Sequence, residues 1–179
     1  MTEGLQRHKT VMPKDPDASA APIVPVEVLR EYLAFRLAGE LYALPLGAIR
    51  EILKPPPITP VPRTAHHILG ILSVRGRVTT VVDLRRRLRL GEQDTDKHTR
   101  VLLVDSGTEV MGLLVDRVLQ VYRLAPDEVE LSGVVGGDIS EFVFGIGRPR
   151  TTRARDNRNA LDADTDILIL LDPTPLLRK

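Results

Sequence analysis

The chain contains no cysteine and no tryptophan, and only 3% of its residues are aromatic. The lack of cysteine excludes disulfides, thiolate metal sites and cysteine nucleophiles, and it fits a cytoplasmic protein. The scarcity of aromatic side chains predicts an aliphatic core. It also argues against a base-stacking platform for single-stranded nucleic acid.

Strong charge and long apolar runs are missing as well. The formal net charge is only +1, so the chain as a whole has no strong field to attract nucleic acid or a membrane. No apolar run reaches the roughly 18 residues that a membrane span requires, and the N-terminal residues lack the apolar core of a secretory signal. We therefore expect a cytoplasmic protein without direct membrane insertion.

The pattern of apolar residues predicts a mainly β protein behind a flexible tail over 1–28, which is rich in Pro and Ala and has no period. Short alternating or apolar runs predict strands, and Ala38–Glu40 predicts a hairpin turn. The expected strands cover about 32–37, 41–44, 71–74, 77–82, 101–104, 110–115, 118–122, 142–146 and 167–171. Strands of this length with frequent glycines indicate small barrels or a sandwich.

Two short helices are expected between the strands. Thr64 is a suitable N-cap for a helix of one or two turns over 64–69. Asp83 can cap a second helix that places Leu84 and Leu88 on one face.

The remaining segments suggest two similar lobes and one long loop. The run Val81-Val82-Asp83 is echoed by Leu114-Val115-Asp116, which hints at a repeat. The polar segment 148–165 is rich in Arg and Asp and predicts a mobile loop between two strands. A short tail over 174–179, with a final helical turn, follows the last strand.

No catalytic or metal-binding set can be assembled from the motifs. His66 and His67 are adjacent, and neighbours on a helix diverge by about 100°, so they cannot easily share one metal ion. Four aspartates each follow an apolar run: Asp83, Asp105, Asp116 and Asp172. We interpret them as caps and turn residues rather than as an acid–base pair. We therefore expect no enzyme activity, no metal and no cofactor.

Arg75 stands beside Gly76 at the expected turn between two strands. Glycine allows a tight turn and brings the backbone close to a partner. The guanidinium offers five donors in a fixed fork, which suits carboxylates or backbone carbonyls of another protein. A surface salt bridge within the fold explains the arginine equally well, so the residues alone leave both interpretations open.

The arginines over 85–89 and 148–158 leave a further alternative, a small β-barrel protein that binds nucleic acid. A solvated face and a solvated loop account for them as well. The near-neutral total charge and the absence of a recognition helix argue against nucleic acid as a partner.

Several segments, in their order and spacing, resemble the CheW-like family of chemotaxis coupling proteins. The resemblance runs from about Glu31 to Asp172. It rests on YLAFRLAGELYALPLGAIREIL, ITPVP, ILGILSVRGRVTTVVDLRRRLRL, VMGLLVDRVLQVYRL, FGIG and ILILLD. It implies a domain over 29–173 made of two SH3-like five-stranded β-barrels, which share an apolar core and carry a few short helices.

The resemblance also implies a function. Members of the family have no catalytic activity and bridge the cytoplasmic tip of methyl-accepting chemoreceptors to the regulatory domain of a CheA-type histidine kinase. The expected location is the cytoplasm, with recruitment to membrane-associated or cytosolic receptor arrays. A paralogue that lacks one partner, and so caps an array or competes within it, is the alternative within the same fold.

Site residues follow from the resemblance, position by position. Arg75 and Gly76 match the Arg-Gly of the family's Asn-Leu-Arg-Gly motif in the receptor-binding groove, and Gly70 and Glu51 match positions near that groove. Four aliphatic residues match the first-barrel patch that packs on the kinase: Leu33, Leu46, Ile49 and Ile52. The last three recur at a spacing of three, which predicts a bent element with one shared apolar face that is exposed for a partner.

The chain departs from the family pattern at three places, one of which is the Arg-rich segment near 148–158, which is longer than in short members of the family. Ser73-Val74 stands where the motif has Asn-Leu, and Thr80 stands where the following strand usually has Pro. Both changes lie close to Arg75, so they are expected to affect which receptor is chosen.

Overall fold

The computed structural model describes residues 28–92, 94–105, 107, 109–131, 140–150 and 167–178. All but the last residue of the tail expected over 1–28, and most of the loop expected over 148–165, lie outside these residues. The strands are β1 (Arg30–Leu37), β2 (Glu40–Pro45), β3 (Ile49–Leu53), β4 (Ile68–Val74), β5 (Arg77–Asp83), β6 (Arg100–Asp105), β7 (Val110–Val115), β8 (Arg117–Leu124), β9 (Val129–Leu131), β10 (Val143–Gly147) and β11 (Leu168–Leu171). The helices are α1 (Leu84–Arg87), α2 (Pro173–Leu176) and two 3₁₀ turns, η1 (Leu46–Ala48) and η2 (Pro126–Glu128).

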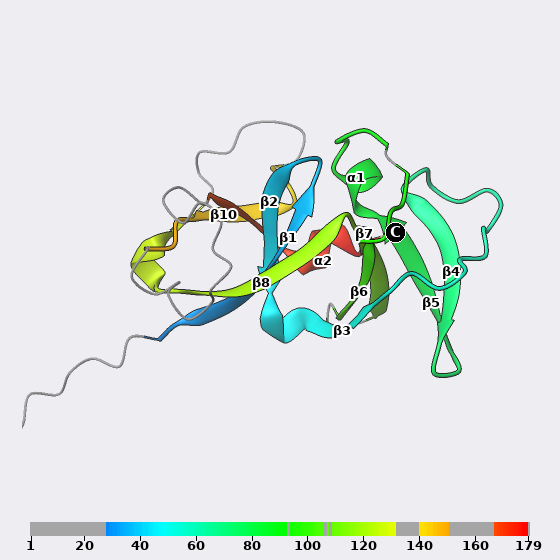
Figure 1. The fold of residues 1–179 in the computed structure, drawn as a ribbon, viewed down its shortest axis with the longest axis horizontal. Helices are drawn as coiled ribbons and strands as arrows, with labels where there is room; N and C mark the ends of the chain where they lie inside the picture. Colours follow the sequence, from blue (N-terminus) through cyan, green and yellow to red (C-terminus); the bar gives the residue numbers. More distant parts are fainter. Residues whose placement is uncertain are drawn as a thin grey trace, which may run out of the picture.

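The strands form two sheets, which make the two lobes seen in Figure 1. One sheet has six strands in the order β8-β1-β2-β11-β10-β9, and the other has five in the order β3-β6-β7-β5-β4. The prediction of a mainly β protein with two lobes is confirmed, although one sheet has six strands rather than five. The chain leaves the first sheet after β2, builds the second sheet, and returns with β8.

The supposed repeat does not mark two lobes. β5 and β7 are parallel neighbours in the five-stranded sheet, with Val81 opposite Gly112 and Asp83 opposite Leu114. The two similar runs therefore lie on neighbouring strands of one sheet instead of occupying equivalent places in separate lobes. The interpretation as a repeat was wrong because two adjacent buried strands have the same apolar requirement.

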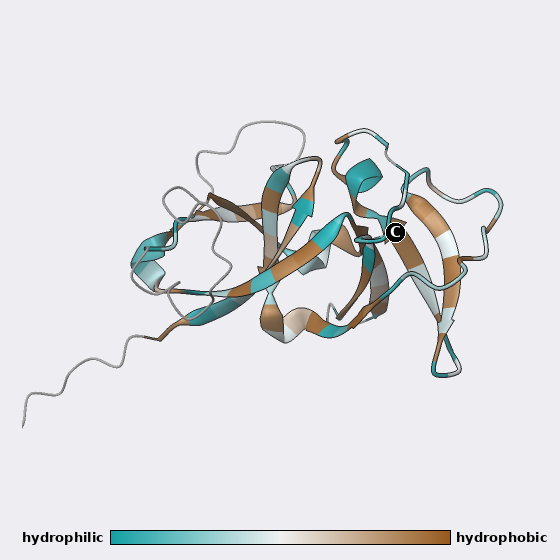
Figure 2. Ribbon diagram, in the orientation of Figure 1, coloured by the Kyte–Doolittle hydropathy of each residue, from teal (hydrophilic) through white to brown (hydrophobic). Residues whose placement is uncertain are grey.

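A shared apolar core lies between the lobes, and each lobe has a smaller core of its own. β1 is buried on both faces. Leu33, Phe35 and Leu37 pack into the shared core, whereas Tyr32 and Ala34 pack into the core of the six-stranded lobe. In Figure 2, brown hydrophobic segments run along strands of both sheets.

The helix expected over 64–69 is absent, because this stretch contains turns and β4 already begins at Ile68. The hydroxyl of Thr64 donates to the carbonyl of Val61 at 3.0 Å and caps no helix. Ile68 pairs with Val82 of β5. A helix of one or two turns is unstable by itself, so strand pairing prevails.

The second helix formed as predicted. The Asp83 carboxylate accepts a hydrogen bond from the amide of Arg86 at 3.2 Å, and Leu84 and Leu88 are buried. The helical turn after Pro173 is also present as α2.

Polar contacts join the lobes at two places. Asp116 accepts the amide N–H of Ala38 at 2.9 Å and is paired with Arg85, whose side chain is only 12% exposed. Arg87 donates to the carbonyl of Pro175 at 3.0 Å and lies 3.1 Å from Nε2 of His67.

Candidate partner-binding surfaces

Arg75 and Gly76 form the two-residue turn between β4 and β5, as predicted. Val74 and Arg77 pair across it, and φ is +48° at Arg75 and +79° at Gly76. Positive φ at both central residues is the type I′ arrangement that suits a tight hairpin, and glycine adopts it without strain. The side chain of Arg75 is 80% exposed at the tip of the hairpin.

Arg75 is paired with Glu51, another residue assigned to the receptor groove. Its Nη2 lies 3.0 Å from Oε1 of Glu51, whose side chain is 30% exposed. Glu51 lies on β3 and Arg75 follows β4, and these two strands are the opposite edges of the five-stranded sheet. The ion pair therefore crosses the open side of the lobe. An exposed pair of this kind contributes about 0–1 kcal/mol, so an incoming partner can exchange it at low cost.

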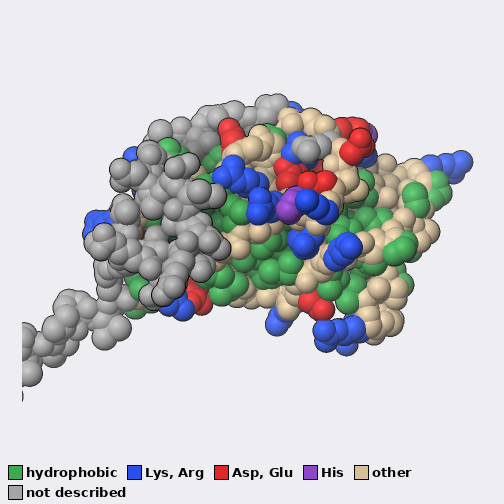
Figure 3. Space-filling model, in the orientation of Figure 1, with side chains coloured by type: hydrophobic (Ala, Val, Ile, Leu, Met, Phe, Trp, Pro, Cys, Tyr) green, Lys and Arg blue, Asp and Glu red, His purple; other side chains and the backbone are tan. Residues whose placement is uncertain are grey.

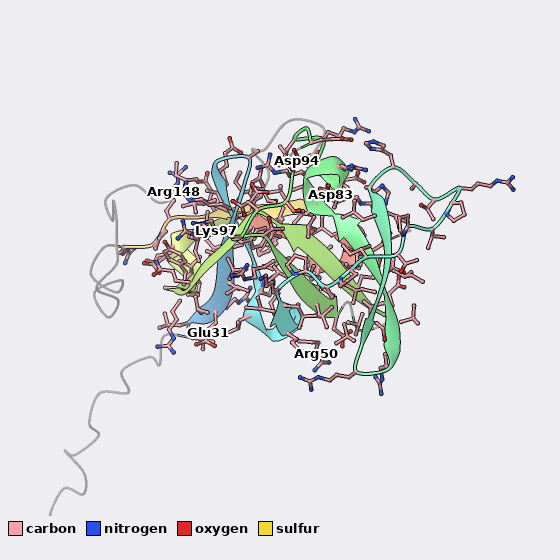
Figure 4. The ribbon with its side chains drawn as sticks, turned by 45° about the vertical axis from the view of Figure 1, so that its right-hand side comes forward. Glu31, Arg50, Asp83, Asp94, Lys97 and Arg148 are labelled. Carbon is pink, nitrogen blue, oxygen red and sulfur yellow. The ribbon has the colours of Figure 1, made fainter. Side chains whose placement is uncertain are left out.

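A groove of about 580 Å³ opens beside this ion pair. It is lined by Arg50, Val74, Arg75, Arg77, Thr79, Leu103, Asp105 and Val110. Arg50 donates to Asp105 at 2.6 Å, and this bond, helped by the amide N–H of Gly107, lowers the pKa of the Asp105 carboxyl. Figure 4 labels Arg50 on the lower side of the molecule, near the β4–β5 hairpin. The groove thus combines an apolar floor with a rim of guanidinium groups.

Gly70 does not line this groove. It is buried, and a Cβ added to it would lie 2.2 Å from the carbonyl oxygen of Thr59. Thr59 exchanges two backbone hydrogen bonds with Ile71, at 2.8 and 2.9 Å, which ties the segment after β3 to the edge of β4. Arg75 follows Gly70 by five positions, which is about 16 Å along a strand. Gly70 therefore shapes the closure of the lobe and offers no side-chain surface.

The predicted kinase patch is only partly at the surface. Leu33 is 4% exposed and belongs to the shared core, so it cannot present a side chain to a partner. β3 is a strand, in which successive side chains alternate. Ile49 packs against the shared core, whereas Ile52 points away and is 43% exposed. The prediction of one face shared by Leu46, Ile49 and Ile52 was wrong, because the spacing of three was interpreted with a helical period.

A hollow of about 610 Å³ lies beside Leu46, and its other lining residues are Leu29, Glu31, Gly47 and Arg123. Glu31 and Arg123 form an ion pair at 2.9 Å across β1 and β8. Figure 4 labels Glu31 on the same lower side as Arg50. Among the described residues, the hollow and the groove share no lining residue, so they are two separate surfaces.

Exposed aliphatic side chains lie in the hollow and on the neighbouring strand β8. Leu29 is 38% exposed, and Val121 of β8, which pairs with Leu33 of β1, is 42% exposed. Hydrophobic side chains form a band across the front of the molecule where β8 runs (Figures 1 and 3). These residues were not predicted from the sequence. The alternation in β8 was visible, but that β8 is an edge strand follows only from the sheet order.

The adjacent histidines face different partners. Nε2 of His66 lies 3.0 Å from Oε1 of Glu92, whereas His67 contacts Arg87. The structure describes no group of three or more His, Cys, Asp or Glu side chains placed to hold a metal, within the residues it covers. In the same residues, no helix is long and apolar enough to cross a membrane.

Comparison with known proteins gives a consistent result. The family model of the CheW-like domain matches residues 31–179. "Chemotaxis protein CheW" of Helicobacter pylori is 30% identical over 122 residues, which cover 68% of this chain and 74% of that protein. "Protein FrzA" of Myxococcus xanthus is 31% identical over 134 residues, covering 74% of this chain and 80% of that protein.

A solved structure supports the same relationship. The crystal structure of the scaffolding protein TtCheW from Thermoanaerobacter tengcongensis superposes with a TM-score of 0.73 at 27% identity. The match covers 85% of this chain and 94% of that one. With the family model spanning all but the first 30 residues, the chain belongs to the CheW-like domain family.

Proposed function

We propose that this chain couples the cytoplasmic tip of methyl-accepting chemoreceptors to the regulatory domain of a CheA-type histidine kinase. Membership of the CheW family makes it a chemotaxis scaffold. What we propose is the assignment of one partner to each surface, in the cytoplasm and without catalysis by this chain. The observation that carries the proposal is the open groove beside Arg75, whose guanidinium is paired, among the described residues, with the partly exposed carboxylate of Glu51 alone.

The groove suits a receptor tip. Val74 and Val110 give it an apolar floor, and Arg75 stands on its rim with most of its surface in solvent. A partner helix can bury apolar side chains on that floor and accept hydrogen bonds from the guanidinium. Exchange of the Glu51 contact for one from the partner keeps the arginine paired throughout.

The hollow suits the kinase domain. Leu29 and Leu46 line it, and exposed aliphatic side chains continue onto β8. Aliphatic surface of this kind, rimmed by the Glu31–Arg123 ion pair, is typical of protein interfaces. In place of Leu33, which is buried, we assign Leu29 and Val121 to this surface together with Leu46.

The receptor assignment is tested with Arg75→Glu, measured by titration calorimetry against a soluble receptor-tip fragment from the same organism. Charge reversal should weaken receptor binding at least tenfold and leave kinase binding within twofold. Arg63→Glu is the matched control, since Arg63 is exposed and does not line the groove. An equal loss for both partners would contradict two separate surfaces.

The kinase assignment is tested with Gly47→Glu. Gly47 lines the hollow, and nothing lies within 4 Å of a Cβ built on it, so the new side chain obstructs the hollow without disturbing the fold. Binding of the isolated kinase regulatory domain should fall at least tenfold. Leu131→Glu, at a residue that is 71% exposed and outside the hollow, is the control and should bind normally. Unchanged kinase affinity in Gly47→Glu would sink the assignment.

The same two titrations of the wild-type chain address the paralogue alternative. A chain that caps or competes within an array binds one partner and not the other. A coupling protein binds both, and it binds them together in a single complex.

A further inference from the structure

We infer that Arg77 makes the groove selective for receptor tips that place a carboxylate next to an apolar side chain. The inference rests on the proposed function and goes beyond it, because it names the chemistry that distinguishes one receptor from another. Arg77 lines the groove together with Arg50 and Arg75. These three guanidinium groups are not in equivalent situations.

Two of the three arginines are already compensated. Arg50 is paired with Asp105 at 2.6 Å, and Arg75 is paired with Glu51 at 3.0 Å. Arg77 is exposed, and it forms no ion pair with any residue that the structure describes. Within the part of the chain that the structure describes, the three guanidinium groups at the groove are matched by two carboxylates, and Arg77 has no counter-charge.

The strand geometry directs Arg77 to the groove. It is the first residue of β5, and it pairs with Val74 of β4. Side chains of a strand alternate, so Arg77 shares a face with Thr79 and Val81, which are buried toward the core of the five-stranded lobe. Val78 lies on the opposite face and is 70% exposed. The side chain of Arg77 is consequently on the face of β5 that lines the groove, where Val74, its partner on β4, also lies.

The floor and the charge together define the partner. Val74, Leu103 and Val110 offer apolar surface, and Val110 is 41% exposed. A purely apolar segment that covers this floor would strip water from an unpaired guanidinium, which is costly. A segment that also carries a Glu or Asp beside its apolar residue pairs that guanidinium with two parallel hydrogen bonds. Arg75 discriminates less between receptor tips, because it is paired with Glu51 before binding and with the partner afterwards.

The test is a double-mutant cycle between the full chain and a soluble receptor-tip fragment, with binding followed by calorimetry. Each acidic residue of the tip is changed singly to Gln, and the chain is used as wild type, Arg77→Gln and the control Arg63→Gln. Arg77→Gln should weaken binding of the unmodified tip about five- to tenfold. One tip variant should lose the same factor against the wild-type chain and lose nothing further against Arg77→Gln. Kinase binding should stay unchanged.

The outcomes separate this inference from the proposed function. If Arg77→Gln binds the tip within twofold of wild type while Arg75→Glu binds at least tenfold more weakly, the inference is overturned and the receptor assignment stands. A loss in Arg77→Gln that adds fully to every tip variant also overturns it. Failure of the wild-type chain to bind the tip overturns both.

Discussion

Substitution of Gly70 by alanine tests how the five-stranded lobe closes. Gly70 has φ of +147°, and its Cβ position lies 2.2 Å from the carbonyl oxygen and 2.8 Å from the carbonyl carbon of Thr59. Both atoms belong to the backbone, so a rotamer change cannot relieve the collision. The segment carrying Thr59 has to move away from β4.

The expected loss of stability can be built from its parts. An alanine held at such a positive φ costs about 1–3 kcal/mol. Displacing Thr59 removes two backbone hydrogen bonds to Ile71, each of which contributes about 1 kcal/mol net. We therefore expect Gly70→Ala to lower the free energy of unfolding by about 3 kcal/mol or more.

Two other glycines separate strain from collision. Gly76 also has a positive φ of +79°, but nothing lies within 4 Å of its Cβ position, so Gly76→Ala should cost only about 1–2 kcal/mol. Gly47 has open space and no positive φ, and Gly47→Ala should change stability by less than about 0.5 kcal/mol. The chain lacks tryptophan, so urea unfolding is followed by far-UV circular dichroism. If Gly70→Ala and Gly76→Ala lower the free energy of unfolding equally, the collision with Thr59 adds nothing to the cost, and the proposed role of Gly70 in closing the lobe is refuted.

Three further substitutions test other contacts. Leu33→Ala should lower the free energy of unfolding by about 2–4 kcal/mol in urea titrations, since it opens a cavity in the shared core, and a loss below about 1 kcal/mol would restore Leu33 as a surface residue. Asp116→Ala should cost about 2–3 kcal/mol in the same assay, because it leaves Arg85 largely buried without its carboxylate, whereas a neutral result would remove Asp116 from the joint between the lobes. Burial, followed by the charges of Arg87 and His66, lowers the pKa of His67 in the folded protein. The unfolded chain therefore takes up the proton first, so stability should fall as pH drops below about 6.5, and His67→Gln should flatten that part of the curve.

The sequence predicts the strands well where the chain carries a clear signal. The Arg75–Gly76 turn and the Asp83 cap follow from local chemistry, and both are present. Prediction from neighbouring residues fails where pairing with a distant strand determines the secondary structure. Ile68 becomes part of β4 because β5 is available for pairing, although the same residues fit a short helix equally well.

The candidate site shows the same division. The resemblance to the family placed Glu51 near the groove of Arg75, but it did not predict their ion pair, since the two residues are 24 positions apart in the chain. Burial of Leu33 could not be anticipated, because a strand covered on both faces is recognised only when the sheet order is known. For the same reason the exposed Val121, on an edge strand, was missed.

The order in which the chain visits the two sheets has a consequence for synthesis. The five-stranded sheet is one continuous stretch, from Ile49 to Val115, so it can close while later residues are still on the ribosome. β2 instead waits for β11, whose Ile169 pairs with Tyr42. Until the last strand emerges, the apolar edge of β2 stays open, and that interval is when a nascent chain is most exposed to aggregation and most dependent on a chaperone.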